Sequence, residues 1–299
     1  MAEENRIDKV YARLMRIHPY GWGLYKKVTT HDIHPGSCGY FDLEGDWKSI
    51  IDLSSEQDLI SQGWKIPDDE IFDNNGPGSA TWGPKTSSSV QSCSIGGTVK
   101  ADNTVASLKT SITVSYKSNS SQGAVLFTES PILRHQIGSE ASALQWMSEN
   151  SSEMMRRHKQ IIKDRGVWIV TKIYSTRRCA IAIMTGRSSS VEINLDNSQG
   201  LLTLAPSSAW TNSSGSSCTE LHEDENRVVV FISGIYFSKK PLRSKLSRSQ
   251  GQEKQKDKIF RGSSDESTDE DDTNNELNVE WYPNFDEDDE GEESDDEFT

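Results

Sequence analysis

The chain has 299 residues, a formal net charge of −14 and a mean hydropathy of −0.67. Hydrophobic residues make up 33%, and no apolar run approaches the ~20 residues of a spanning helix, which excludes a helical membrane protein and a chain packed throughout into one core. Residues 261–299 hold 18 Asp and Glu against one Arg, so this tail carries −17 and residues 1–260 carry +3.

Residues 5–17 are predicted to form the first helix. Apolar and basic residues recur there at helical spacing on two stripes: Ile7, Val10, Leu14 and Ile17 on one, and Arg6, Lys9, Arg13 and Arg16 on the other. Pro19 ends the helix, because proline lacks an amide donor. The first twenty residues contain no apolar signal-peptide core, so we expect synthesis in the cytosol.

The next segments favour a short strand at 38–43, a helix at 55–62 and a loop at 65–89. Strand-like sequence follows from 90 to 128. It is clearest at 108–117, where Leu108, Thr110, Ile112, Val114 and Tyr116 alternate with polar residues for ten positions.

A helix at 139–165, ended by Gly166, precedes the remaining predicted strands. Residues 167–175 and 179–185 are expected to form a hairpin around a turn at 176–178, and 191–195, 201–204 and 227–237 add strands. We therefore predict an α+β domain over 1–237, with a twisted antiparallel sheet and flanking helices. A basic linker at 238–261, with nine Lys and Arg against two acids, and an acidic disordered tail at 262–299 are expected to follow it.

The sequence favours a protein that is not an enzyme and has no cofactor. No nucleotide-binding loop, nucleophile elbow, zinc-protease motif or dinucleotide fingerprint occurs. The His31, His34 and Cys38 spacing could suit a metal, but it spans a Pro-Gly turn without a fourth ligand, so we expect no metal. The separated Cys38, Cys93, Cys179 and Cys218 favour buried free thiols. Nucleic acid is not an expected partner, because the acidic tail would repel phosphates.

Two features favour a membrane surface. The alternation at 108–117 fits the 9–11 residues of a transmembrane strand, although a half-exposed strand of a soluble protein shows the same pattern. The high Ser and Thr content of 86–128 tips the balance towards the membrane. Basic clusters could bind acidic phospholipids, or could simply be solvated helix faces: Arg6, Lys9, Arg13, Arg16, Lys26, Lys27, Arg156, Arg157, Lys159 and Lys163.

Residues 1–237 also resemble a known domain in the order of their elements. The segments that carry the resemblance are RRHKQIIKDRGVWIVTKIYSTRRCAIAIMTG at 156–186, SIGGTVK at 94–100, LKTSITVSY at 108–116 and RVVVFISGIYF at 227–237. They are similar to segments of the gasdermin pore-forming domain: its basic helix and following strands, its first membrane-inserting hairpin and its closing strand.

The resemblance implies binding to acidic phospholipids of the inner leaflet and assembly into a homo-oligomer, or a hetero-oligomer with a homologous chain. Two regions, 87–129 and 166–196, would unfold into long β-hairpins that form a pore and cause lytic cell death. The implied inserting residues are Leu108, Ile112, Val114, Tyr116, Val167, Ile169, Ile173, Ile181 and Ile183. The short tail, in place of a helical repressor domain, resembles fungal gasdermin-like proteins that act in non-self recognition, or heterokaryon incompatibility.

The tail has two interpretations. It could inhibit membrane docking until a protease cuts within 238–262, with Trp281, Tyr282 and Phe285 anchoring it in an apolar groove. It could equally be a solubilising tail phosphorylated at Ser263, Ser264 or Ser267. The expected location is the cytoplasm when latent and the plasma membrane when active. The alternative function is a soluble β-rich interaction module whose tail recruits a partner.

Overall fold

The structure is a computed structural model that describes residues 6–67, 71–72, 76–99, 110–198, 201–204, 210–238 and 277–282. Within these residues the helices are α1 (Ile7–Met15), α2 (Glu56–Ser61) and α3 (Glu140–Asp164). The strands are β1 (Trp22–Gly23), β2 (Ser37–Phe41), β3 (Trp47–Asp52), β4 (Gly78–Ala80), β5 (Lys85–Thr86), β6 (Val90–Val99), β7 (Thr110–Ser118), β8 (Gln122–Thr128), β9 (Ile132–Gln136), β10 (Val167–Ser198), β11 (Leu201–Leu204), β12 (Trp210–Ser238) and β13 (Asn278–Tyr282).

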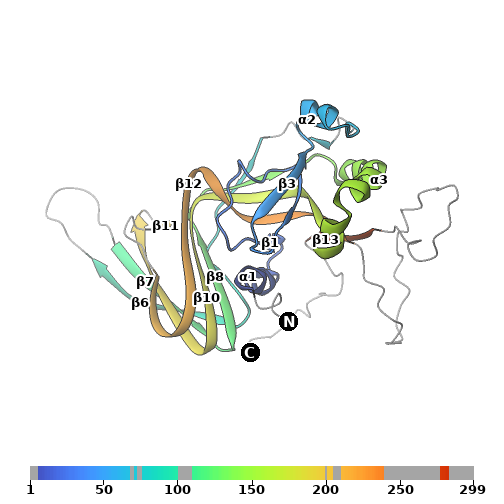
Figure 1. Ribbon diagram of the computed structural model, residues 1–299. Helices are drawn as coiled ribbons and strands as arrows, with labels where there is room; N and C mark the ends of the chain where they lie inside the picture. The colour runs from blue at the N-terminus through green and yellow to red at the C-terminus, as the bar shows by residue number, and fades with distance from the viewer. Residues whose placement is uncertain are drawn as a thin grey trace, which may run out of the picture.

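All thirteen of these strands belong to one antiparallel sheet, and α3 and α1 flank it (Figure 1). This confirms the predicted α+β class. The long strand β10 organises the sheet. It pairs with β12 from Val167 opposite Phe237 to Ile193 opposite Trp210, and its other edge pairs in turn with β2, β9, β8 and β7.

The predicted turn at 176–178 is wrong, because β10 runs unbroken through these residues for 32 positions. The polar side chains that suggested a turn are instead paired across the sheet. Buried Thr176 donates to the Glu129 carbonyl (2.5 Å), and Arg178 forms an ion pair with Glu223 (2.9 Å). A register shift lies between Thr176 and Arg178, where β10 advances by two positions and β12 by five, from Val228 to Glu223. The strand that forms a hairpin with β10 is therefore β12.

The three predicted helices are confirmed, and their ends follow from local chemistry. Ser55 and Ser139 are the N-caps of α2 and α3, where each side chain accepts an amide hydrogen bond from the residue three positions later. Gly166, with φ +71°, ends α3 in the left-handed region that glycine adopts at no steric penalty. A kink at His158 interrupts α3 before that end.

Each face of the sheet near α3 has its own core. On one face, α3 contributes Trp146 and Met154, which cluster with Ile169, Ile235 and Phe237 of β10 and β12. On the opposite face, the segment at 24–33 covers the alternate positions of the same strands with Leu24, Val28 and Ile33. Further along, α1 packs Tyr11 and Met15 against Ile181, Ile183 and Phe231. We call the part of the sheet that α1, α3 and the segment at 24–33 cover the helix-covered region.

Beyond residue 185 the long strands bend back on themselves (Figure 1). A hydrogen bond that only a bent strand allows shows this: Arg178 Nη1 donates to the carbonyl of Leu204 (2.9 Å), and Leu204 pairs with Leu195 of β10. Residues 178 and 195 would lie about 55 Å apart on a straight strand at ~3.3 Å per residue. The bend coincides with a register shift after Thr185 and with positive φ at Gly186, Ser188 and Gly215.

Past the bend lies what we call the fold-back region: β6, β7, β11, residues 190–198 of β10 and residues 210–214 of β12. Its apolar side chains, among them Tyr116, Val191 and Ile193, pack onto Ala180, Met184 and others that precede the bend. Neither α1, α2 nor α3 contributes to this cluster. The fold-back region is therefore held by sheet packing on sheet.

Candidate functional site

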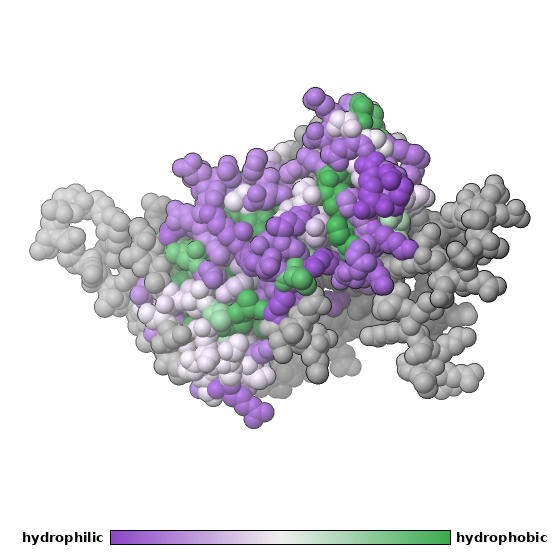
Figure 2. Space-filling model, viewed as in Figure 1, coloured by the Kyte–Doolittle hydropathy of each residue, from purple (hydrophilic) through white to green (hydrophobic). Residues whose placement is uncertain are grey.

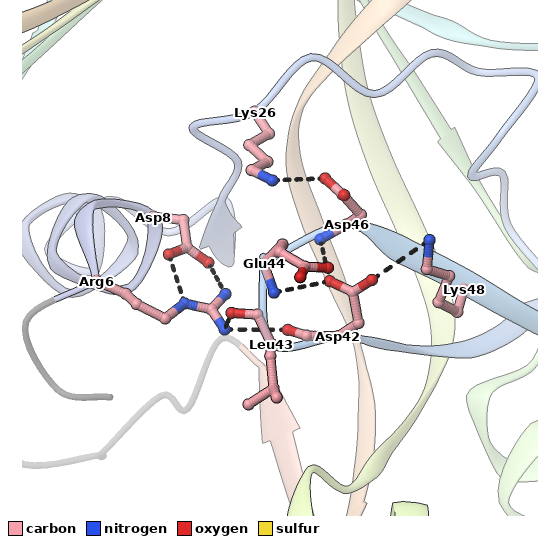
Figure 3. A network of polar contacts seen from close by, with 8 residues as sticks. All are labelled: Arg6, Asp8, Lys26, Asp42, Leu43, Glu44, Asp46 and Lys48. Atoms are coloured by element: carbon pink, nitrogen blue, oxygen red, sulfur yellow. Dashed lines mark hydrogen bonds and ion pairs between the residues drawn. The ribbon is translucent and has the colours of Figure 1, made fainter. Parts of the chain in front are cut away.

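Arg6 of the predicted lipid-binding set is part of an internal polar network (Figure 3). Its guanidinium donates to Asp8 (Nε to Oδ1, 3.0 Å) and to the carbonyls of Asp42 (3.0 Å) and Leu43. Only 17% of the Arg6 side chain and 20% of the Asp8 side chain are exposed. Arg6 therefore ties α1 to the turn between β2 and β3.

Lys26 and Lys27 also lie against carboxylates. Lys26 Nζ is 2.6 Å from Asp46 Oδ1 in the same network, and Lys27 Nζ is 2.8 Å from Asp224 Oδ2. The hydrogen bond from Lys27 lowers the pKa of the Asp224 carboxyl. An anionic headgroup would have to compete with these acids for the two lysines.

The basic residues of α3 form a second cluster. Arg156 Nη2 lies 2.6 Å from Glu153, which Arg157 also contacts, and the hydrogen bond from Arg156 lowers the pKa of Glu153 to about 2. The Arg157 guanidinium sits 4.4 Å from the centre of the Trp64 ring. Lys159 and Lys163 occupy exposed positions on the same helix.

The ten predicted lipid-binding residues do not gather on one surface. Arg6, Lys9 and Lys26 lie together on the rim of a cavity of about 270 Å³ beside α1. The α3 cluster belongs to the helix that covers the other face of the sheet. Arg13 of α1 points elsewhere, donating to Gln122 Oε1 (3.1 Å) next to the bend.

The cavity beside α1 is a feature that the sequence analysis missed. Its walls include the aromatic rings of Trp22, Phe41, Trp168 and Tyr236. The centroids of Trp168 lie 6.1 Å from Trp22 and 5.1 Å from Tyr236. These rings come from four separate strands, so no local pattern in the sequence could have grouped them.

Five of the predicted membrane-inserting residues are buried before the bend. Their exposed fractions are 0 or 1%: Val167, Ile169, Ile173, Ile181 and Ile183. They pack under α3, under the segment at 24–33 or under α1. The view of Figure 2 accordingly shows a mostly hydrophilic face on which hydrophobic residues form small, separate patches.

The other inserting residues lie on β7 in the fold-back region, except Leu108, which lies outside the described residues. The strand predicted there is confirmed. Val114 and Tyr116 join the apolar cluster, whereas Thr113, on the other face, donates from Oγ1 to Asn194 Oδ1 (2.6 Å) at an exposed position. The strand thus has one apolar and one polar face.

Part of the acidic tail forms a sheet strand. β13 pairs antiparallel with the end of β12, from Ser238 opposite Asn278 to Gly234 opposite Tyr282. Leu277 is 7% exposed, and both Leu277 and Val279 pack against the core that α3 covers. The backbones of Trp281 and Tyr282 belong to this strand, whereas Phe285 and most of 262–299 lie outside the described residues. The alternation of Leu277, Val279 and Trp281 was the available signal for a strand.

The first half of β12 was also missed. Residues 210–223 pair with β10, but their run of Ser, Asn and Thr shows no apolar alternation. Their strand conformation follows from the long partner rather than from local propensity.

Within the residues that the structure describes, His31, His34 and Cys38 are not among the side chains that come together as possible metal ligands. Cys38 and Cys179 are buried free thiols, Cys218 is half-buried, and burial raises the pKa of Cys38. His34 Nε2 instead lies 3.2 Å from Asp52. Carboxylate oxygens of Asp42, Glu44 and Asp46 come within 4.8 Å of one another, yet Lys48 and Lys26 neutralise two of them.

Among the described residues no helix has the length and apolar character needed to cross a membrane. No protein-family model matches the chain, and no curated protein matches it. Among solved structures the chain is similar to one described as "Cryo-EM structure of the Gasdermin A3 membrane pore", with 8% identity over 78% of this chain and 90% of that chain. The TM-score of 0.28 is too low to carry a conclusion about function.

Proposed function

We propose that this chain is a pore-forming protein that binds acidic phospholipids, oligomerises and inserts β-hairpins into a membrane. The supporting observation is the fold-back region, in which two continuous strands of 32 and 29 residues turn sharply and pack on themselves without a helix. A ladder of this length is already built, and straightening the bend would extend it without breaking its strand pairing.

The length of the ladder exceeds what a membrane requires. At about 3.3 Å per residue the straightened β10 would extend about 100 Å, against a hydrocarbon thickness of ~30 Å. β7, with nine residues and one apolar face, is by itself of membrane-spanning length. We infer that the inserting hairpins are β6 with β7 and the distal parts of β10 with β12.

The bend contains residues suited to rearrangement. Gly186 and Gly215 adopt positive φ, and the buried polar Ser189 lies three residues after Gly186. A site with small polar side chains forms fewer apolar contacts, so its local opening requires less free energy than opening of the helix-covered region.

Insertion would require several copies. A hairpin in lipid leaves backbone groups on both edges without partners, and only a closed barrel satisfies them all. Assembly of this chain with itself, or with a homologous chain, would supply those edges. Basic side chains on α1 and α3 would attract anionic lipid, at about 1 kcal/mol for each contacting charge.

We place this activity in lytic cell death of the kind that serves fungal non-self recognition, with the protein cytoplasmic before activation and at the plasma membrane after it. The tail would hold the protein latent until a protease cuts the basic linker. Support for this comes from β13, which joins the tail to the sheet and begins 40 positions after the end of β12. Release of β13 would expose an edge of β12 to another copy.

Dye release from vesicles tests the proposal. A specific protease site is placed in the linker at 239–276 of the full chain, and leakage is measured before and after cutting, with and without acidic phospholipid. We expect release only after cutting and only with acidic lipid. Leakage from the uncut chain would reject inhibition by the tail. Absence of leakage in every arm would favour the alternative of an interaction module, whose sheet edge binds a strand of a partner as β12 binds β13.

A matched pair of substitutions on β7 tests the strand assignment. Val114→Asp places a charge on the apolar face and Thr113→Asp places the same charge on the polar face. After both variants are shown to be folded, we expect Val114→Asp to abolish leakage and Thr113→Asp to keep it, because a charged side chain on the lipid face destabilises an inserted strand, most strongly at mid-membrane. Equal leakage from the two would reject β7 as an inserted strand.

A further inference from the structure

The geometry points to the aromatic cavity beside α1 as a docking site for an aromatic and acidic peptide. We propose that its occupant is residues 283–289 of this chain, with Phe285 in the cavity and the acidic residues 286–289 at its basic rim. This inference concerns docking alone and holds whether or not the protein forms pores.

The register of the sheet brings this segment to the cavity. β13 and β1 pair with the same edge of β12, since β10 occupies the other edge. Tyr282 lies opposite Gly234, and Trp22 lies opposite Ile232, two residues further along. Two residues beyond Tyr282 the edge of β12 is therefore already paired with β1, and Tyr282 lies about 7 Å along this edge from Trp22, a wall of the cavity.

The reach of the segment matches the cavity. Two residues separate Tyr282 from Phe285, so the two Cα atoms are three residue steps and at most about 10 Å apart. Tyr236, opposite Glu280 on the neighbouring strand, lines the same cavity as Trp22, so the wall runs alongside the last residues of β13. Phe285 can thus reach the cavity without any change in the pairing of β13.

The chemistry of the cavity matches the segment. A cavity of 150 Å³ can hold benzene, so about 270 Å³ admits a phenyl side chain. Aromatic walls favour an aromatic guest in offset or edge-to-face contact. The rim carries Arg6, Lys9, Lys26 and Arg165 together with the acids Asp8, Asp42 and Asp164, which leaves one net positive charge. Phe285 is followed directly by five acidic residues, at 286–290.

Because β13 tethers residues 283–289 to the sheet, weak contacts with the cavity are sufficient for docking. Because β13 is already paired with β12, residues 283–289 meet the cavity at an effective concentration in the millimolar range. Each contact then adds to the binding of β13, so the two parts dissociate as one ligand when the linker at 239–276 is cut.

The test measures how fast the C-terminal fragment leaves after cutting. The full chain carries a specific protease site in the linker at 239–276, and release of the fragment is followed by rapid gel filtration and mass spectrometry. Phe285→Ala is compared with Phe298→Ala, which removes the same side chain nearer the C-terminus. Lys9→Glu on the rim is compared with Lys163→Glu on α3.

We expect release to become at least tenfold faster in Phe285→Ala and Lys9→Glu, and to match the unsubstituted chain in Phe298→Ala and Lys163→Glu. A fragment that leaves the unsubstituted chain as fast as it leaves Phe285→Ala would overturn docking in the cavity and leave only the pairing of β13. A short-chain acidic phospholipid is also added in the absence of vesicles. Faster release in its presence would support the proposal, because it would show that the lipid competes with residues 283–289 for the cavity. A lipid that binds the cavity equally well before and after cutting would overturn the proposal in favour of a lipid site.

Discussion

The helix-covered region and the fold-back region share the strands β10 and β12 but are stabilised differently. In the first, large side chains such as Trp146 and Phe237 pack between the sheet and α3. In the second, a single smaller cluster that includes Tyr116, Val191 and Ile193 packs on residues before the bend such as Ala180 and Met184. One hydrogen-bonded ladder thus crosses two regions whose tertiary support differs in size.

This difference allows the two regions to open separately. Burying one aliphatic side chain stabilises a fold by about 1.5–3 kcal/mol. The single cluster of the fold-back region therefore adds less than the larger cluster under α3 together with the two clusters on the opposite face. Cooperative units of unequal stability within one domain are common. The fold-back region is therefore the unit expected to open first.

The largest expected effect comes from truncating Trp146, which is 2% exposed and donates from Nε1 to the Lys65 carbonyl (2.7 Å). Trp146→Ala should lower the free energy of unfolding by about 3–5 kcal/mol, because it leaves a large cavity and an unpaired carbonyl. Urea denaturation followed by circular dichroism measures this loss.

Ile193→Ala is the matched change in the fold-back region, where Ile193 is 1% exposed. We expect faster amide exchange in β7 and in 190–198. The free energy of unfolding of the helix-covered region, measured by urea denaturation, should change by less than about 1 kcal/mol. If Ile193→Ala instead accelerates exchange evenly through α3, the two regions unfold together and the comparison fails.

A second change breaks the bend. Gly215 has φ +74°, and an added Cβ would lie 2.3 Å from Ser189 Oγ. Gly215→Ala should therefore cost about 1–3 kcal/mol through backbone strain and overlap, measured as the stability of the fold-back region by hydrogen exchange. Gly83→Ala is the control, because nothing lies within 4 Å of its added Cβ. Equal effects would show that the bend at Gly215 is not under steric constraint.

The sequence predicted elements where a local pattern was strong. The stripe of α1, the N-cap Ser139 before α3 and the alternation on β7 all have a period that matches the element formed. It failed at 176–178, where pairing with Glu129 and Glu223 keeps polar residues within a strand. Long-range partners decided that conformation, and they leave no trace in the local period.

The candidate sites were harder to predict for a related reason. Charge patterning identified Arg6 as a surface cation, but the carbonyls that hold it come from residues 36 and 37 positions away. The cavity beside α1 likewise unites four strands. Neither the pairing of a cation nor the meeting of distant rings follows from spacing along the chain.

A third, smaller effect separates structural from surface cations. Arg6→Gln should lower the free energy of unfolding by about 1–2 kcal/mol, because it removes charge-assisted hydrogen bonds that join α1 to the turn between β2 and β3. Lys163→Gln on exposed α3 should change it by less than about 0.5 kcal/mol. Thermal unfolding of both variants measures the contrast, and an Arg6→Gln variant as stable as Lys163→Gln would return Arg6 to the set of available lipid-binding cations.

The smallest effect is a pH dependence of the free energy of unfolding, and it comes from His34, directly after the segment at 24–33. His34 is hydrogen-bonded on both ring nitrogens, to Asp52 through Nε2 (3.2 Å) and to the Pro35 carbonyl through Nδ1 (3.1 Å). Two acceptors favour the protonated ring, and the hydrogen bond with Asp52 raises the pKa of His34 above its ordinary value, although burial opposes this.

The sign of the effect follows from that shift. A raised folded-state pKa means that the stabilisation is fully present below the ordinary value of about 6.5 and is lost as pH rises through the higher folded value. His34→Gln should therefore destabilise the protein more at pH 5.5 than at pH 8.5. The difference should stay below about 1 kcal/mol, because about a third of each side chain is exposed. Asp52→Asn should remove most of this pH dependence, whereas an unchanged dependence in Asp52→Asn would mean that another group holds the His34 proton.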